Sequence, residues 1–262
     1  MGKTAKTVTE DGVEIVYELD GTGAPLLLIH GTMENRTIWE PVMPLLLQDY
    51  QVIRLDLRGH GESGPATTYD MHALASDVAA VARDLGLAIP HLVGHSLGGA
   101  VATVVAGTMG AHSVVNVDQP FQDPNLFAEL LPLEERLRGP QYAQALFELM
   151  AGLSDGALTS AQLAKVRQLC DSGRQEVLLA LWAPFFQGQL PALLAMFEAF
   201  LPTITTPYLS LHGRTPPLGY QSWLQGLMPQ AHFAVMTGTG HYPFLVDPVG
   251  FVKQIKDFHL SL

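Results

Sequence analysis

The segment Leu92-Val93-Gly94-His95-Ser96-Leu97-Gly98-Gly99-Ala100 constrains the fold of this chain more than any other. It places a serine in a Gly-x-Ser-x-Gly pattern between a short apolar run and a run of small residues suited to a helix. Glycines two positions before and after the serine permit a sharp turn from strand to helix. Such a turn exposes the Ser96 hydroxyl at a helix N-terminus, where free N–H groups can stabilise a developing oxyanion. We therefore predict that Ser96 is a nucleophile.

A nucleophilic serine needs a histidine that accepts its proton and an acid that orients this histidine. Of the ten histidines in the chain, His241 is the strongest candidate, because it follows the apolar run 232–236 on a loop that contains Gly238 and Gly240. It also precedes the amphipathic segment 247–259, which we expect to form the last helix. The sequence thus predicts His241 as the general base.

Four motifs together resemble those of the α/β-hydrolase superfamily. They are Leu27-Leu28-Ile29-His30-Gly31-Thr32, Asp56-Leu57-Arg58-Gly59-His60-Gly61-Glu62-Ser63, Gly94-His95-Ser96-Leu97-Gly98 and Gly240-His241. The resemblance covers the chain from about residue 13 to its end and is specific for a fold but not for a substrate. It implies an oxyanion hole formed by the backbone N–H groups of Thr32 and Leu97.

The position of the acid departs from the commonest pattern of this superfamily. Most members carry an Asp shortly after the penultimate strand, which we place at 208–212, but no Asp or Glu occurs between Thr203 and Phe244. The expected strand 113–117 is followed directly by Asp118, at the sheet edge where open α/β sheets build their sites. We therefore predict Asp118 as the orienting acid, with Asp123 as the nearest alternative and a turn-forming role as the competing interpretation of Asp118.

Some branches of the superfamily also place the acid after this strand. They include haloalkane dehalogenases, a fungal zearalenone lactonase and cofactor-free dioxygenases that open heteroaromatic rings. A dehalogenase would need a carboxylate in place of Ser96. The resemblance therefore favours a zearalenone-lactonase-like or dioxygenase-like acid placement.

Strands and helices alternate along most of the chain, which predicts an α/β fold with a mostly parallel sheet flanked by helices. We expect strands at 13–18, 26–30, 51–55 and 113–117, and the turn-forming residues 20–23 suggest that the first two pair as a hairpin. Between Asp118 and Thr206 only helical patterns occur, at 125–131, 141–153, 160–170, 175–182 and 193–201. We therefore expect an α/β-hydrolase core formed by residues 1–118 and 207–262, with a helical cap at 119–206.

The cap is rich in large apolar side chains that would cover a cleft above Ser96. They are Phe121, Phe127, Phe147, Trp182, Phe185, Phe186, Met196 and Phe197. For the substrate pocket itself, the sequence predicts Met33, His95, Trp182, Phe186 and Tyr242. The cap lacks a cluster of basic residues, which favours an uncharged, apolar small-molecule substrate.

The composition limits the partners of the chain. A formal net charge of −11 argues against nucleic acid and anionic membrane surfaces, which attract clustered Lys and Arg. The single cysteine, Cys170, excludes an intrachain disulfide and favours a reducing, cytoplasmic location. The scattered histidines and the lack of Cys pairs predict no metal site, and the proposed chemistry needs no cofactor. The oligomeric state stays open.

These observations together predict a serine hydrolase that cleaves an ester or lactone of an apolar small molecule through an acyl-enzyme on Ser96. Two alternatives remain. A cofactor-independent ring-opening dioxygenase would use the same His–Asp pair to deprotonate its substrate, and oxygen uptake would identify it. A ligand-binding protein on a hydrolase scaffold would bind tightly without turnover.

Overall fold

A computed structural model describes residues 2–123 and 128–262 of the chain. Its strands are β1 (Lys3–Val8), β2 (Glu14–Gly21), β3 (Ala24–Ile29), β4 (Tyr50–Leu55), β5 (His91–His95), β6 (Ser113–Val117), β7 (Tyr208–His212) and β8 (Ala231–Val235). They form one eight-stranded sheet in the order β1-β2-β4-β3-β5-β6-β7-β8. The pairs β1–β2 and β2–β4 are antiparallel, and all other neighbours are parallel. The predicted mostly parallel sheet is therefore confirmed.

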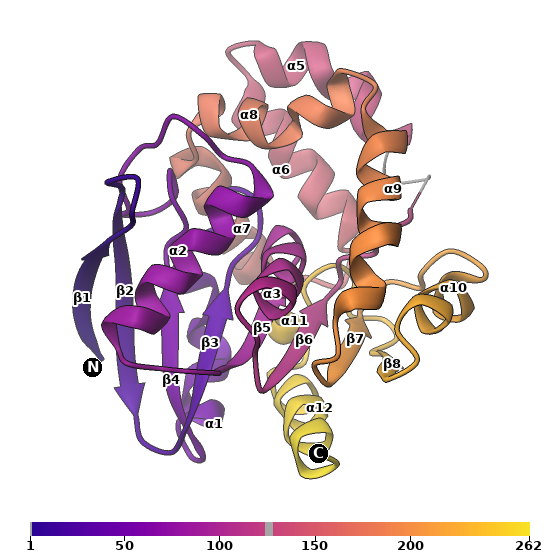
Figure 1. Cartoon of the computed structure of the whole chain (residues 1–262). Coiled ribbons are helices and arrows are strands. Elements are labelled where there is room, and N and C mark those ends of the chain that lie inside the picture. The colour runs from indigo at the N-terminus through magenta and orange to yellow at the C-terminus, as the bar shows by residue number, and fades with distance from the viewer. Residues whose placement is uncertain (1, 124–127) are drawn as a thin grey trace.

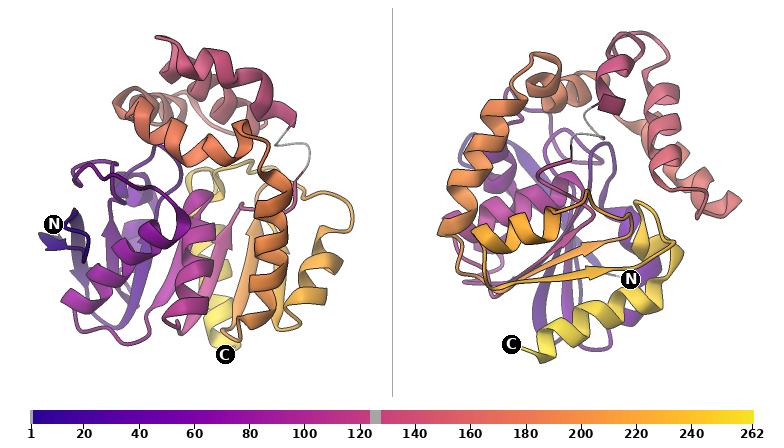
Figure 2. Two further views of the ribbon diagram at one scale, coloured as in Figure 1. Left: turned by 45° about the horizontal axis from the view of Figure 1, so that its top comes forward. Right: turned by 90° about the vertical axis from the view of Figure 1, so that its right-hand side faces the viewer.

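Helices cover both faces of the sheet (Figures 1 and 2). The helices of the core are η1 (Arg36–Val42), α1 (Met43–Leu46), α2 (Met71–Asp84), α3 (Leu97–Thr108), α10 (Tyr220–Leu227), α11 (Pro243–Val246) and α12 (Pro248–Leu260). Helices α2 and α3 pack together on one face, whereas α1, α11 and α12 lie with η1 on the other. Two apolar layers therefore enclose the central strands, whose side chains are buried on both sides.

The prediction that the strands at 13–18 and 26–30 pair as a hairpin is wrong. These strands correspond to β2 and β3. Strand β4 lies between β2 and β3 and pairs with both: Gly21 is opposite Gln51, and Ala24 is opposite Tyr50. The turn at 22–23 passes around the start of β4, and a Cβ atom on Gly23 would collide with the backbone of Asp49. The residues of a turn thus fix a chain reversal but not the partner of each strand.

Between β6 and β7 the described chain is helical. It contains η2 (Leu131–Leu133), α5 (Glu134–Arg138), α6 (Tyr142–Leu153), α7 (Ser160–Ser172), α8 (Gln175–Phe186), α9 (Leu190–Phe200) and η3 (Leu201–Thr203). Helices α5 to α8 gather at one end of the sheet, and α9 runs back along the core towards β7 (Figures 1 and 2). The helices expected at 141–153, 160–170, 175–182 and 193–201 are present. The helix expected at 125–131 lies partly outside the described residues, and Phe127 lies outside them. The division into core and cap stays a prediction.

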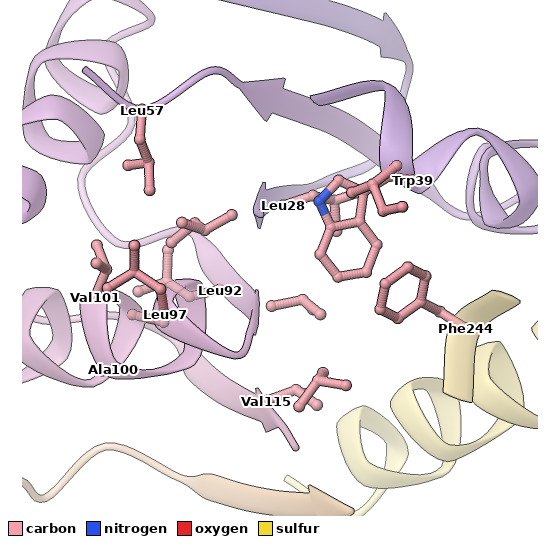
Figure 3. Close-up of a cluster of buried hydrophobic side chains, with 14 of the residues drawn as sticks. Leu28, Trp39, Leu57, Leu92, Leu97, Ala100, Val101, Val115 and Phe244 are labelled. Carbon is pink, nitrogen blue, oxygen red and sulfur yellow. The ribbon is translucent and has the colours of Figure 1, made fainter. Parts of the chain in front are cut away.

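Part of the core holds the loop that carries His241. The rings of Trp39 and Phe244 are 4.5 Å apart, on the side of the strands opposite Val101 of α3 (Figure 3). Both side chains are fully buried, so each removes a large apolar surface from water. This contact fixes α11, which begins two residues after His241, against η1.

Candidate active site

Ser96 occupies a strained turn between β5 and α3. Its φ and ψ are 50° and −122°, a backbone conformation that residues other than glycine rarely adopt. Its backbone N–H donates to the carbonyl oxygen of Val117 at 2.8 Å, which ties the turn to the end of β6. A Cβ atom on Gly94 would collide with the carbonyl of Gly98, and one on Gly98 would collide with that of Ile29. The two glycines therefore permit the close strand–helix contact that the sequence predicted.

Asp118 follows β6 directly, in a left-handed conformation with φ of 51°. Its Oδ2 accepts a hydrogen bond from His241 Nδ1 at 2.7 Å. Its Oδ1 accepts the backbone N–H groups of Gly213 at 3.0 Å and Arg214 at 3.2 Å, just after β7. Both carboxylate oxygens are thus used, and the geometry suits an acid that orients His241 through its Nδ1–H.

The environment keeps this pair in the protonation states that proton transfer requires. Burial raises the pKa of Asp118, but the hydrogen bond from His241 and its charge outweigh burial and hold the pKa below its usual range. Burial lowers the pKa of His241, and the charge of His95 lowers it further, against the opposing effect of Asp118. Asp118 is therefore ionised and His241 neutral near pH 7.

Contacts from the helices between β6 and β7 fix the His241 loop. The backbone N–H of His241 donates to the carbonyl of Leu153, at the end of α6, at 3.1 Å. Gly240 has φ of 58°, and a Cβ atom there would collide with the backbone of Ser154. The loop is thus held from outside the sheet as well as through Asp118.

One cavity of about 540 Å³ joins these groups, and its wall includes Ser96, Asp118 and His241. The wall is otherwise largely apolar and includes Leu97, Ala100, Phe121, Leu130, Leu149, Met150, Leu153, Leu181, Trp182, Phe185, Leu193, Met196 and Phe197. Thr32 also lines it, so both residues whose N–H groups the resemblance assigned to an oxyanion hole border the space beside Ser96. Asp123, the alternative acid, lines the wall too, but the hydrogen bond to His241 Nδ1 comes from Asp118.

Four of the five predicted pocket residues lie outside the wall; only Trp182 lines it. Met33 has φ of 59°, and its side chain is buried against Gly173. His95 and Tyr242 are buried behind His241, and Phe186 at the end of α8 faces Arg138, with the guanidinium 5.9 Å from the ring. These four positions differ from the prediction, because neither sequence proximity to a catalytic loop nor a place among the helices between β6 and β7 fixes the direction of a side chain.

The apolar side chains expected to cover the cleft divide in the same way. Phe121, Trp182, Phe185, Met196 and Phe197 line the cavity. Phe147 does not; its ring packs under the guanidinium of Arg167 at 4.2 Å.

The sequence interpretation missed several polar residues of the cavity wall, three of which contact Asp118 or His95. His212 and Arg214 line the cavity at the end of β7, and His212 Nδ1 is 3.8 Å from Asp118 Oδ1. Burial lowers the pKa of His212 to about 4, so it is neutral near pH 7. The third residue, Glu34, pairs with His95. The position of His212 and Arg214 at a strand end was a usable signal, and so was a lone carboxylate so close to the His30-Gly31 pair.

Over residues 2–123 and 128–262, no group of three or more His, Cys, Asp and Glu side chains is arranged to hold a metal ion. In the same ranges no single helix is both long enough and apolar enough to cross a membrane. Helices α8 and α9 with η3 reach that length and hydropathy only together, across a bend of 88°.

Comparison with known proteins decides the family. The model of the alpha/beta hydrolase family matches residues 26–254, most of the chain. The chain belongs to the alpha/beta hydrolase family. The predicted fold is therefore confirmed, and so is the prediction that the protein is a hydrolase.

Individual members of the alpha/beta hydrolase family resemble the chain over nearly its whole length. A pimeloyl-[acyl-carrier protein] methyl ester esterase of Photobacterium profundum is 28% identical, over 93% of this chain and 98% of the esterase. A solved structure of a thermophilic esterase from Thermogutta terrifontis is 26% identical with a TM-score of 0.83, over 99% of this chain and 98% of that one. The esterase RhEst1 from Rhodococcus sp. ECU1013 is also 26% identical, with a TM-score of 0.76 and 99% of both chains covered.

Proposed function

We propose that this protein is a serine hydrolase that cleaves a carboxylic ester or lactone of an apolar small molecule. One observation carries the proposal: Ser96 and the hydrogen-bonded pair of His241 and Asp118 line the same largely apolar cavity. The esterases among the relatives support an ester as the scissile group.

The reaction follows from the roles that these groups can perform. Ser96 Oγ attacks the carbonyl carbon while His241 accepts the hydroxyl proton, and Asp118 holds the imidazole and stabilises its charged form. The backbone N–H groups of Thr32 and Leu97 stabilise the oxyanion. His241 then protonates the leaving alcohol, and water attacks the acyl-enzyme with His241 as base. Ser96 is restored and the acid is released.

The charges around the cavity support an uncharged substrate. Within the described residues, Arg214 is the only Lys or Arg of the wall, whereas four carboxylates line it: Glu34, Asp70, Asp118 and Asp123. An anionic substrate would meet this acidic surround in a cavity of low dielectric, which disfavours its binding. Leu181, Phe185 and Phe197 offer apolar contacts to a neutral acyl or alcohol group instead.

Hydrolysis of neutral and carboxylated p-nitrophenyl esters of equal length tests the proposal. We expect turnover of the neutral esters, a clear preference for them, and loss of turnover in Ser96→Ala. Retained esterase activity in Ser96→Ala would contradict the role of Ser96. Oxygen uptake by wild type with a heteroaromatic substrate, in the absence of ester hydrolysis, would identify the dioxygenase instead.

A further inference from the structure

Glu34, which lines the cavity, forms a buried ion pair with His95, which lies outside the cavity wall. The two carboxylate oxygens of Glu34 are 2.9 and 3.0 Å from His95 Nδ1. The side chains are 5% and 0% exposed, so solvent screens the pair very little. The catalytic steps above use neither residue.

The hydrogen bonds around His95 determine its protonation. Nδ1 faces the Glu34 carboxylate, and Nε2 lies 2.9 Å from the backbone carbonyl oxygen of His241. A carbonyl oxygen only accepts, and the Glu34 carboxylate also accepts the N–H of Gly31 at 2.6 Å. Both ring nitrogens of His95 therefore donate, which makes the ring an imidazolium. Burial lowers the pKa of His95, but Glu34 outweighs burial and raises it.

These contacts join three loops of the active site. Gly31 belongs to the loop of Thr32, His95 is the neighbour of Ser96 in the nucleophile turn, and His241 carries the imidazole of the general base. We propose that Glu34 and His95 are positioning residues, which hold the His241 loop against the nucleophile turn through the hydrogen bond from His95 Nε2–H. This inference rests on the function proposed above.

Energetics alone do not account for the pair. Bringing two charges into a protein interior costs free energy that their attraction only partly returns, and apolar residues of similar volume often stabilise as well or better. What the ion pair adds is direction, because a charged donor fixes the His241 carbonyl in one place. A displacement of the base by about 1 Å can reduce the rate about a hundredfold.

The pair also places a positive charge beside the general base. The His95 and His241 rings are 4.6 Å apart. The other charged or titratable groups near His241 are Asp118 at the end of β6, Glu34 after β3, and His212 after β7, on the other oxygen of Asp118. The ring of Tyr242 also lies 5.2 Å from that of His241, but burial raises the pKa of its hydroxyl, so it carries no charge in the range of the experiment. Besides burial, the charge of His95 lowers the pKa of His241, whereas Asp118 and Glu34 oppose this. Removing both charges of the ion pair should therefore raise the pKa of His241.

Two variants separate position from charge. Glu34→Gln can still accept from Gly31 and donate to His95 Nδ1, so a neutral His95 keeps its Nε2–H bond to His241. We expect this variant to fold, to lose less kcat than His95→Asn does, and to shift the acid limb of its pH–rate profile to higher pH. His95→Asn can reach Glu34 but not the His241 carbonyl. We expect its kcat to fall about 10- to 100-fold, with a smaller change in KM and slower labelling of Ser96 by a fluorophosphonate.

A second buried ion pair, between two residues that do not line the cavity, provides the matched control. Arg58 Nη2 and Asp77 Oδ1 are 2.8 Å apart, and both side chains are 0% exposed. Asp77→Asn should lower the thermal midpoint of unfolding without changing the kcat per folded molecule or the acid limb, since it alters stability only.

The outcomes distinguish the inference from the proposed function. Wild-type kcat in folded His95→Asn would overturn the positioning role, and an unmoved acid limb in Glu34→Gln would overturn the charged donor by which His95 is proposed to hold the His241 loop. If His95→Asn does not fold, Glu34→Ala replaces it: this change removes the group that orients His95 through Nδ1, so kcat should fall, and wild-type kcat in that folded variant would overturn the positioning role. A wild type that neither hydrolyses esters nor reacts with the fluorophosphonate would overturn the proposed function, and the positioning role would fall with it.

Discussion

Asp118 Oδ1 accepts the backbone N–H of Gly213 at 3.0 Å, which links the end of β6 to the first residue after β7. The loop after β7 is where most α/β-hydrolases carry their acid. Here that loop carries no carboxylate and instead donates two N–H groups, from Gly213 and Arg214, to an acid on the neighbouring strand. Because those donors favour the ionised form of Asp118, this loop supports the carboxylate that we propose as the acid.

Replacing Asp118 with Asn should greatly reduce turnover while leaving the fold intact. The Asn side chain can still accept from Gly213, but it cannot stabilise a charged His241 and favours the wrong tautomer of the imidazole. We expect kcat to fall about 10³- to 10⁴-fold with a neutral p-nitrophenyl ester, at unchanged circular dichroism. An equal loss in Asp123→Asn, with little loss in Asp118→Asn, would assign the acid to Asp123.

The pH dependence of turnover should show the lowered pKa of His241. Burial and the charge of His95 depress this pKa below the ordinary value of 6.5, and the general base must be neutral to act. The acid limb of kcat/KM should therefore have its midpoint below pH 6.5, with activity retained as the pH falls through that value. Initial rates with a neutral ester across the acidic and neutral range measure it. A midpoint above 6.5 would contradict the assigned environment of His241.

Gly213→Ala should damage the site more than the fold. A Cβ atom on Gly213 would collide with the carbonyl of Gly240, the residue before His241. The substitution displaces either the His241 loop or the N–H that Asp118 accepts, so we expect kcat to fall at least about tenfold. Gly226→Ala in α10 is the control, because a Cβ there meets no atom within 4 Å and alanine favours a helix. Equal activity of the two variants would show that the contact between Gly213 and Gly240 is unimportant.

A second prediction of pH dependence concerns stability. The rings of His91 and His259 are 4.0 Å apart. His91 begins β5, at the opposite end of this strand from Ser96, and His259 also contacts Tyr50 and Ser113. Burial and the nearby histidines lower the pKa of His91 to about 4 and that of His259 to about 3, from an ordinary 6.5. At pH values between these lowered pKa values and 6.5, the unfolded chain binds more protons than the folded one. Stability from this cluster is thus complete above pH 6.5 and declines as the pH falls towards 3.

Thermal unfolding at a series of pH values measures this effect. The decline should be shallower in His259→Gln, whereas His72→Gln, a change at an exposed histidine, should behave as wild type does. Equal slopes in wild type and His259→Gln would exclude the cluster as a source of acid sensitivity.

The sequence predicted those parts of the site that depend on local backbone geometry. Ser96 was recognisable because Gly94 and Gly98 must be small where α3 meets β5 and β3. Asp118 and His241 were recognisable because they follow strands that end at one edge of the sheet. The hydrogen bond between them agrees with that interpretation. Their catalytic roles stay a prediction.

Features that depend on distant parts of the chain were not predictable in the same way. Strand β1 escaped notice because KTAKTV is an edge strand with exposed lysines and no apolar alternation. The β2–β3 turn could not reveal that β4 would insert between its strands. Likewise, Met33 and His95 lie next to catalytic loops in sequence, but the left-handed backbone at Met33 and the buried Glu34 direct both side chains away from the cavity.

The most direct test of the account is the reaction of the wild-type protein with a fluorophosphonate, with the modified residue located by mass spectrometry. Because His241 and Asp118 activate a single hydroxyl group, the account predicts rapid, stoichiometric labelling of Ser96 and of no other serine, and much slower labelling in Asp118→Asn. Absence of the adduct from Ser96, or equal labelling rates in the two proteins, would contradict it.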